Sequence, residues 1–124
     1  MTTLAFSVPG RPVPCARPRT VRTKTGKTVT YTPARVQKYK SAVGFHALAA
    51  RQRLARWPLN ATYRVAIVVT IASGVFGDVD NYGKSVLDGC TRVLWADDKQ
   101  VVGCNVERVR AKVAGLEVCV EIVS

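Results

Sequence analysis

Apolar positions that alternate with polar ones predict the strands of a sheet. Residues 4–8 alternate and stop at Pro9-Gly10, a pair typical of turns. Residues 64–71 are rich in β-branched side chains and mostly apolar on both faces, which predicts a central strand. A strand of mixed pattern, with a bulge, is expected over 101–112. Residues 116–122 alternate cleanly and predict a last strand.

Apolar positions that recur every three or four residues predict two helices. The longer helix runs over about 33–56, with Thr32 as N-cap and Pro58 beyond its end. The second helix begins with Asp80 as N-cap. It contains two glycines, and each weakens a helix by about 1 kcal/mol relative to alanine.

A basic hairpin is predicted before the long helix. Residues 20–23 and 28–31 read as short strands that flank the tip Lys24-Thr25-Gly26-Lys27. The proline-rich run 11–19 before them predicts an extended basic loop. Loop and tip suit phosphate contact, although a surface loop kept soluble by lysine is an equal alternative. The chain order β, β-hairpin, α, β, α, β, β predicts an α+β fold, with a small mixed β-sheet packed against two helices in one domain over residues 1–124.

Charge is divided unevenly along the chain. Thirteen of the nineteen lysines and arginines lie before Asp78, and all eight acidic residues lie from Asp78 onward. The net charge of +11 favours an acidic partner, with nucleic acid first and an anionic membrane surface second. Because 48% of the residues are hydrophobic, we expect a folded domain and not a disordered basic tail.

The cysteines and the single histidine argue against zinc or thiol chemistry. The four cysteines have no C-x-x-C spacing, and His46 falls within the predicted long helix with no acid nearby in sequence. We therefore expect free thiols in a reducing cytoplasm. Neither a secretory signal nor an apolar run long enough to cross a membrane is found, so no membrane partner is expected.

Five of the eight acids fall between Asp78 and Asp98. Asp78 and Asp80 project from one face if the backbone there is extended. Asp97 and Asp98 precede a predicted strand, and they would meet the first pair if that strand lies beside the one ending near Ile71. Converging carboxylates repel each other, and a hard cation such as Mg²⁺ removes that cost.

Lys84 and Asp88 follow Asp80 at successive four-residue steps, so the three side chains share one helix face. A purely structural explanation is also available, in which Asp80 only caps a helix, the three residues form surface ion pairs, and Asp97-Asp98 make a turn. The density of acids in this stretch favours the metal site over that explanation.

The run G-D-V-D-N-x-x-K-x-x-x-D, followed by L-W-A-D-D-K-Q-V-V, resembles the RusA family of Holliday-junction resolvases. The early P-G-R-P-V-P-C-A-R-P-R, the Y-T-P before the long helix and the closing L-E-V-C-V-E-I are similar too. The resemblance spans nearly the whole chain. It implies a RusA-like α+β homodimer with a Mg²⁺-dependent site in each subunit.

The resemblance also implies roles for individual residues. Three match the family's metal-binding aspartates: Asp78, Asp80 and Asp98. Lys84 matches its essential lysine and completes the expected catalytic set, while Asp88 and Asp97 match less critical acids. The chain departs from the family in having Cys15 where relatives often have lysine, and Gly83 and Gly89 where better helix formers are usual.

The implied reaction is phosphodiester hydrolysis. Mg²⁺, for which Mn²⁺ is expected to substitute, would polarise a phosphate oxygen and activate water. Lys84 would neutralise charge that develops on the phosphate. Seven basic residues are expected to contact DNA: Arg11, Arg17, Arg19, Arg22, Lys24, Lys27 and Lys84. A two-fold dimer would match the approximate two-fold symmetry of a four-way junction and nick two like strands.

We therefore predict a cytoplasmic endonuclease, bacterial or phage-encoded, that resolves Holliday junctions with Mg²⁺. Two alternatives stay open at this point. One is a non-catalytic, basic nucleic-acid-binding protein whose aspartates only cap and pair. The other is a metal nuclease that acts on other branched DNA.

Overall fold

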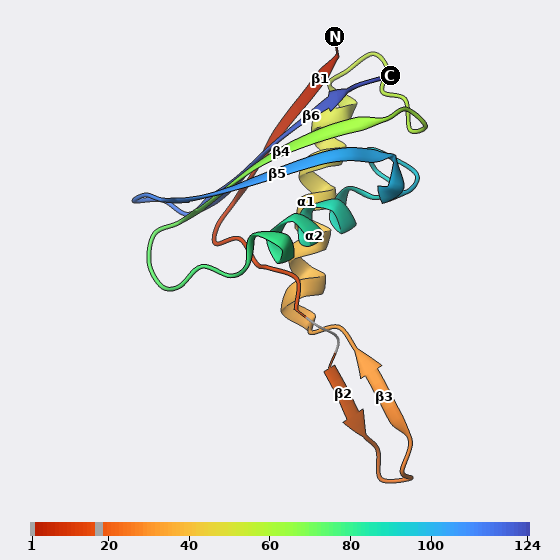
Figure 1. The fold of residues 1–124 in the computed structure, drawn as a ribbon, viewed down its shortest axis with the longest axis vertical. Coiled ribbons are helices and arrows are strands. Elements are labelled where there is room, and N and C mark those ends of the chain that lie inside the picture. The colour runs from red at the N-terminus through yellow and green to blue at the C-terminus, as the bar shows by residue number, and fades with distance from the viewer. Residues whose placement is uncertain (1, 17–18) are drawn as a thin grey trace.

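The computed structural model describes residues 2–16 and 19–124. Its body is a four-stranded sheet with two helices on one face (Figure 1). The sheet contains β1 (Thr3–Pro9), β4 (Tyr63–Ile71), β5 (Val101–Arg110) and β6 (Gly115–Ile122). The helices are α1 (Ala34–Gln52), α2 (Val79–Cys90) and the short 3₁₀ helix η1 (Asp98–Gln100). A separate hairpin consists of β2 (Arg19–Arg22) and β3 (Thr28–Tyr31).

The sheet is mixed, as predicted. Its strand order is β1-β6-β4-β5, with β6 antiparallel to both of its neighbours and β5 parallel to β4. The strand β4 is therefore central, which confirms the prediction from its two apolar faces. The predicted bulge is confirmed where Tyr63 pairs with Val101 but Arg64 pairs with Gly103.

The core lies between the sheet and the helices. Alternate residues of β1, β4 and β6 are buried on the face that α1 and α2 cover. From α1, the residues Val36, Tyr39, Val43, Ala47 and Ala50 are buried, at the three- or four-residue spacing predicted for this helix. This packing fixes α2 between α1 and the strand β5.

Two glycines let α1 and α2 approach closely. A Cβ atom on Gly89 would lie 2.8 Å from the backbone oxygen of Lys40 and 2.8 Å from Cβ of Val43. A Cβ on Gly44 would lie 2.9 Å from the backbone oxygen of Gly89. Any larger side chain at Gly89 would separate the helices, so this glycine serves the packing at a cost to helix propensity.

Three predicted helix limits were wrong. Pro33, not Thr32, is in the N-cap position of α1. This helix ends at Gln52 instead of about Arg56, because the following chain turns to bury Trp57, whose Nε1 donates to the oxygen of Leu94 at 2.8 Å.

The helix α2 begins two residues earlier than predicted. Asp78, not Asp80, occupies its N-cap position, in extended backbone. The backbone oxygen of Asp78 accepts hydrogen bonds from the backbone N–H groups of Asn81 and Tyr82. Asp80 therefore lies in the first turn, where the helix dipole favours a negative charge.

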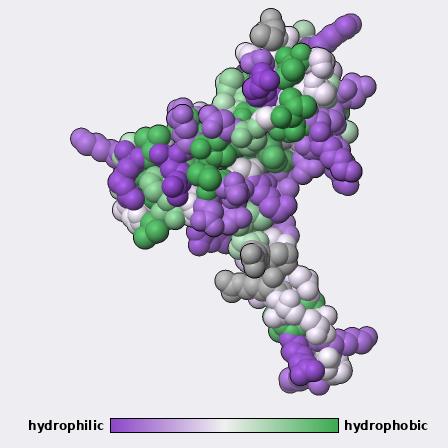
Figure 2. Space-filling model, viewed as in Figure 1, coloured by the Kyte–Doolittle hydropathy of each residue, from purple (hydrophilic) through white to green (hydrophobic). Residues whose placement is uncertain are grey.

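The hairpin of β2 and β3, called the arm below, extends away from the body (Figure 1). Every residue from 20 to 31 is exposed. Hydrophilic side chains gather at its tip, where Lys24 and Lys27 lie (Figure 2).

All four cysteines are free thiols, as predicted. In the described part of the chain, no helix is both long and apolar enough to cross a membrane.

Candidate active site

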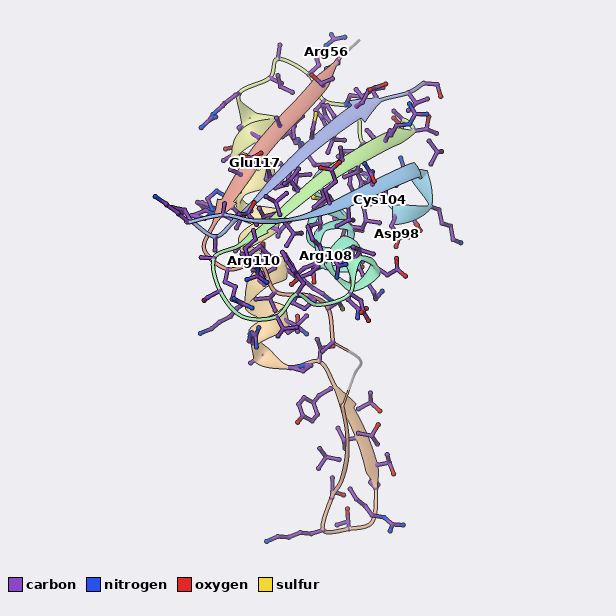
Figure 3. All side chains as sticks on the ribbon, turned by 60° about the vertical axis from the view of Figure 1, so that its left-hand side comes forward. Arg56, Asp98, Cys104, Arg108, Arg110 and Glu117 are labelled. Atoms are coloured by element: carbon purple, nitrogen blue, oxygen red, sulfur yellow. The ribbon has the colours of Figure 1, made fainter. Side chains whose placement is uncertain are left out.

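A pocket lies between α2 and β5 and gathers most of the predicted acids. We call it the α2–β5 pocket. Its charged lining residues are Asp80, Lys84, Asp88 and Asp98. The remaining lining residues are Val79, Gly83, Leu87, Cys104, Asn105 and Val106. In Figure 3, Asp98 lies between the start of β5 and α2, close to Cys104.

The residues of this pocket are placed by the helical spacing of α2 and the alternation of β5. Asp80, Lys84 and Asp88 recur at four-residue steps, so they line one face of α2, as predicted. Cys104 and Val106 alternate on the side of β5 that faces this helix. A Cβ on Gly83 would sit only 3.4 Å from Cγ2 of Val106, so the helix lies close against the strand.

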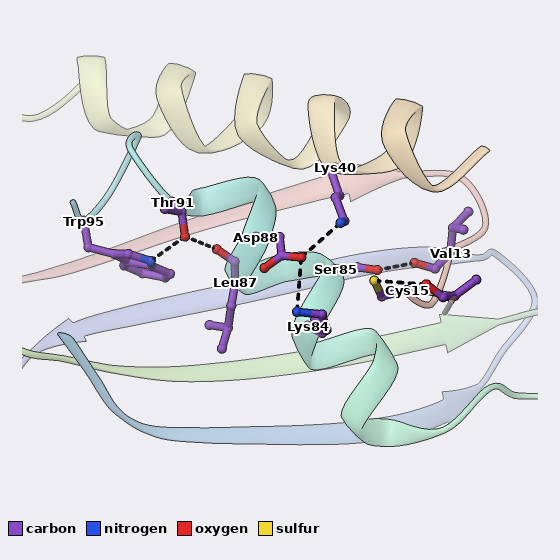
Figure 4. A network of polar contacts seen from close by, with 10 residues as sticks. Val13, Cys15, Lys40, Lys84, Ser85, Leu87, Asp88, Thr91 and Trp95 are labelled. Atoms are coloured by element: carbon purple, nitrogen blue, oxygen red, sulfur yellow. Dashed lines mark hydrogen bonds and ion pairs between the residues drawn. The ribbon is translucent and has the colours of Figure 1, made fainter. Parts of the chain in front are cut away.

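Asp88 forms ion pairs with two lysines. Its Oδ2 lies 3.0 Å from Nζ of Lys40 on α1 and 3.7 Å from Nζ of Lys84 (Figure 4). Within the described residues, neither Asp80 nor Asp98 takes part in an ion pair. The carboxylates of Asp80 and Asp98 are therefore the two in the pocket that have no cationic partner there.

Asp97 has a local structural role. Its Oδ1 accepts a hydrogen bond from the backbone N–H of Lys99 at 2.9 Å, and the Gln100 side chain accepts one from the backbone N–H of Asp97. This capping box fixes the start of η1, whose first residue is Asp98. The hydrogen bond from Lys99 lowers the pKa of the Asp97 carboxyl.

Strand pairing does not by itself bring Asp98 to Asp78. The strand β5 lies beside β4, but the parallel register pairs Val101 with Tyr63, at the opposite end of β4 from Ile71. Asp80, in the first turn of α2, nevertheless lines the same pocket as Asp98. Asp78 precedes this helix and is not among the pocket residues, and the described residues contain no group of three possible ligands close enough for one metal ion.

The predicted DNA-binding residues are divided between the arm and the body. On the arm, Arg19 begins β2, Arg22 ends it, and Lys24 and Lys27 lie in the exposed turn. Arg11 instead binds the body, donating to the backbone oxygens of Ser73 and Val75. Arg17 lies outside the described residues.

Two arginines near the site were not predicted. Arg108 donates to the oxygen of Gly77 at 3.3 Å, and Arg110 donates to the oxygen of Gly74 at 2.9 Å. Their spacing of two residues on a predicted strand was a usable sign that both share one face. Cys104, whose pKa is raised by burial, was likewise not connected with the pocket.

Comparison with known proteins identifies the family. The model of the family Endodeoxyribonuclease RusA matches residues 9–121, nearly the whole chain. None of the curated proteins matches this chain. Family membership implies Holliday-junction resolvase activity, and nucleases of this family generally depend on a metal ion. It also decides against a purely binding protein. The chain thus belongs to the RusA family, and it is an endodeoxyribonuclease.

Proposed function

We propose that the α2–β5 pocket is the catalytic centre of a Mg²⁺-dependent nuclease that resolves four-way DNA junctions. The observation that carries this proposal is that Asp80 and Asp98, which have no cationic partner in the described part of the chain, line one pocket with Lys84. Carboxylate oxygens are the ligands that hard divalent cations prefer, so the donor chemistry fits Mg²⁺, or Mn²⁺ in its place.

Each residue has a separate part in this proposal. Asp80 and Asp98 would hold the metal ion from the pocket, and Asp78, which lies outside it at the entry to α2, would join them as the ion draws the three carboxylates together. The bound metal ion supplies charge that polarises the phosphate and lowers the pKa of water. Lys84, whose side chain is 62% exposed, can reach a phosphate at the pocket mouth and neutralise developing negative charge. Asp88 restrains this lysine through their ion pair.

The arm would hold a DNA branch. Arg22, Lys24 and Lys27 are exposed and the arm has no acidic residue, so a phosphate backbone can approach it without repulsion. Affinity should fall steeply with salt, because each neutralised phosphate releases counterions. We further propose a two-fold homodimer, since two identical sites can then nick two like strands of one junction.

The test is cleavage of a synthetic four-way junction with and without Mg²⁺. Asp80→Asn is expected to abolish cleavage while junction binding stays intact or becomes stronger, because a negative charge near the DNA is removed. Glu107→Gln removes the same charge from the exposed outer face of the sheet and serves as the matched control. Retained cleavage by Asp80→Asn would refute the site.

A second comparison defines the substrate. Junction, fork and linear duplex are cleaved side by side under the same conditions. A clear preference for the junction supports the resolvase function, whereas equal cleavage of the fork would assign the pocket to branched DNA in general. Sizing of the protein alone and with a junction tests the dimer.

A further inference from the structure

The loop that leads into α2 has little regular structure of its own, yet its backbone is held at several points. We call residues 72–77 the pre-α2 loop. Hydrogen bonds from arginine side chains reach four of its backbone oxygens, those of Ser73, Gly74, Val75 and Gly77. Side chains from two distant parts of the sequence therefore fix the segment that immediately precedes Asp78.

Three arginines make these contacts. Arg11 donates to Ser73 and, at 3.2 Å, to Val75. Arg110 and Arg108 donate from β5 to Gly74 and Gly77, and in Figure 3 both lie between this strand and the loop. We call these three residues the arginine clamp.

An aromatic ring and two glycines complete the arrangement. The guanidinium carbons of Arg108 and Arg110 lie 5.5 and 5.2 Å from the centre of the Phe76 ring, within the range of cation–π attraction. Gly74 has a φ of +84°, and a Cβ on it would lie 2.9 Å from Nη2 of Arg11. Gly77 donates its backbone N–H to the hydroxyl of Tyr82 at 2.9 Å, which ties the end of the loop to α2.

We propose that Arg11, Arg108 and Arg110 are positioning residues for the nuclease reaction, which hold the pre-α2 loop so that Asp78 and Asp80 enter α2 at a fixed place. This inference rests on the proposed function of those aspartates. A guanidinium suits the task better than an ammonium, because its planar fork can donate to two oxygens while its face contacts an aromatic ring. The clamp acts on the backbone, and its charge alone is not sufficient.

The test separates charge from geometry. Arg110→Lys keeps the charge and loses the fork, and Arg110→Gln loses both. We expect both variants to lower the cleavage rate at saturating junction and Mg²⁺ by about 100-fold, the order of loss that a displacement of about 1 Å can cause. Binding of the junction without Mg²⁺ should change no more than in Lys112→Gln, a matched loss of an exposed charge nearby.

Two further measurements exclude a general effect on folding. The Mg²⁺ concentration for half-maximal cleavage should rise in both variants. The amide hydrogen of Gly77, which donates to the Tyr82 hydroxyl, and those of Asn81 and Tyr82, which donate to the oxygen of Asp78, should exchange faster while those of α1 stay unchanged. Arg108→Lys repeats the test at a second clamp residue, in case Arg110 variants do not fold.

Other outcomes would overturn the inference. If Arg110→Lys cleaves like the unchanged protein, charge is sufficient and the clamp has no positioning role. If Arg110→Gln loses only junction affinity, with the slope of log affinity against log salt reduced by about one, and Arg110→Lys keeps both the affinity and the slope, the arginine contacts a DNA phosphate instead. Normal cleavage by the clamp variants beside an inactive Asp80→Asn would reject the clamp alone, while an active Asp80→Asn would reject the proposed site.

Discussion

The close crossing of α1 and α2 gives a sharp prediction, because α2 contains two glycines in different surroundings. A Cβ on Gly89 would meet the backbone oxygen of Lys40 and Cβ of Val43, both at 2.8 Å, and neither atom can move without its helix. A Cβ on Gly83 would meet Val106 and Cys104 at 3.4 and 3.8 Å, which is close to ordinary contact. The same substitution should therefore have opposite effects at the two positions.

The magnitudes follow from two opposing effects. Alanine gains about 1 kcal/mol over glycine inside a helix. At Gly83 most of this gain should remain, so Gly83→Ala is expected to stabilise the protein by up to about 1 kcal/mol. At Gly89 overpacking costs about 1–3 kcal/mol, so Gly89→Ala should lower the free energy of unfolding by up to about 2 kcal/mol.

Urea and thermal unfolding, followed by circular dichroism, measure both effects. For a domain of this size about 1 kcal/mol corresponds to roughly 4 °C in Tm, so the two variants should differ by several degrees. The urea dependence (m value) should not change, since both folded states bury the same surface. If Gly89→Ala were as stable as Gly83→Ala, the helices would not cross at this glycine and the packing derived above would be refuted.

Three further predictions concern other groups. The buried hydroxyl of Tyr39 has no hydrogen-bond partner among the described residues, so Tyr39→Phe should raise the free energy of unfolding by about 1 kcal/mol in urea titrations. A variant with a lower free energy of unfolding than the unchanged protein would show that the hydroxyl does have a partner. Burial raises the pKa of the Cys90 thiol, whereas an unfolded thiol ionises near about 8.5. The contribution of the neutral Cys90 thiol to the free energy of unfolding is therefore fully present below that pH and falls as pH rises above it. The free energy of unfolding of Cys90→Ala should accordingly depend less on pH between about 8 and 10. Cys104 is exposed at the α2–β5 pocket, and partial desolvation there raises its pKa, so iodoacetamide, followed by mass spectrometry, should modify it only at higher pH than a free cysteine, and the modified protein should lose cleavage.

Sequence patterns predicted the sheet well because burial alternates along each strand. In β1, Leu4, Phe6 and Val8 are buried and the residues between them are exposed, and the alternation of residues 4–8 records this directly. The N-terminus of α2 was less predictable, because Asp78 and Asp80 are both good cap residues. The choice between them depends on backbone geometry that the pre-α2 loop imposes.

The candidate site could be predicted only in its composition. Lys84 and Asp88 were expected on one face with Asp80, since four-residue spacing is a local property. The place of Asp98 depends on whether β5 runs parallel or antiparallel to β4, and no residue pattern specifies this. Arg108 and Arg110 were missed because they bind backbone oxygens, which every residue type carries.

The arm has a consequence for how the protein can change. Its strands contact mainly each other, and a hairpin of two strands is only marginally stable in water. The arm should unfold and refold independently, with little effect on the thermal unfolding of the body. The sequence of residues 20–31 can therefore change, and with it the branched DNA that the arm binds, while the core that carries the aspartates still unfolds as one cooperative unit.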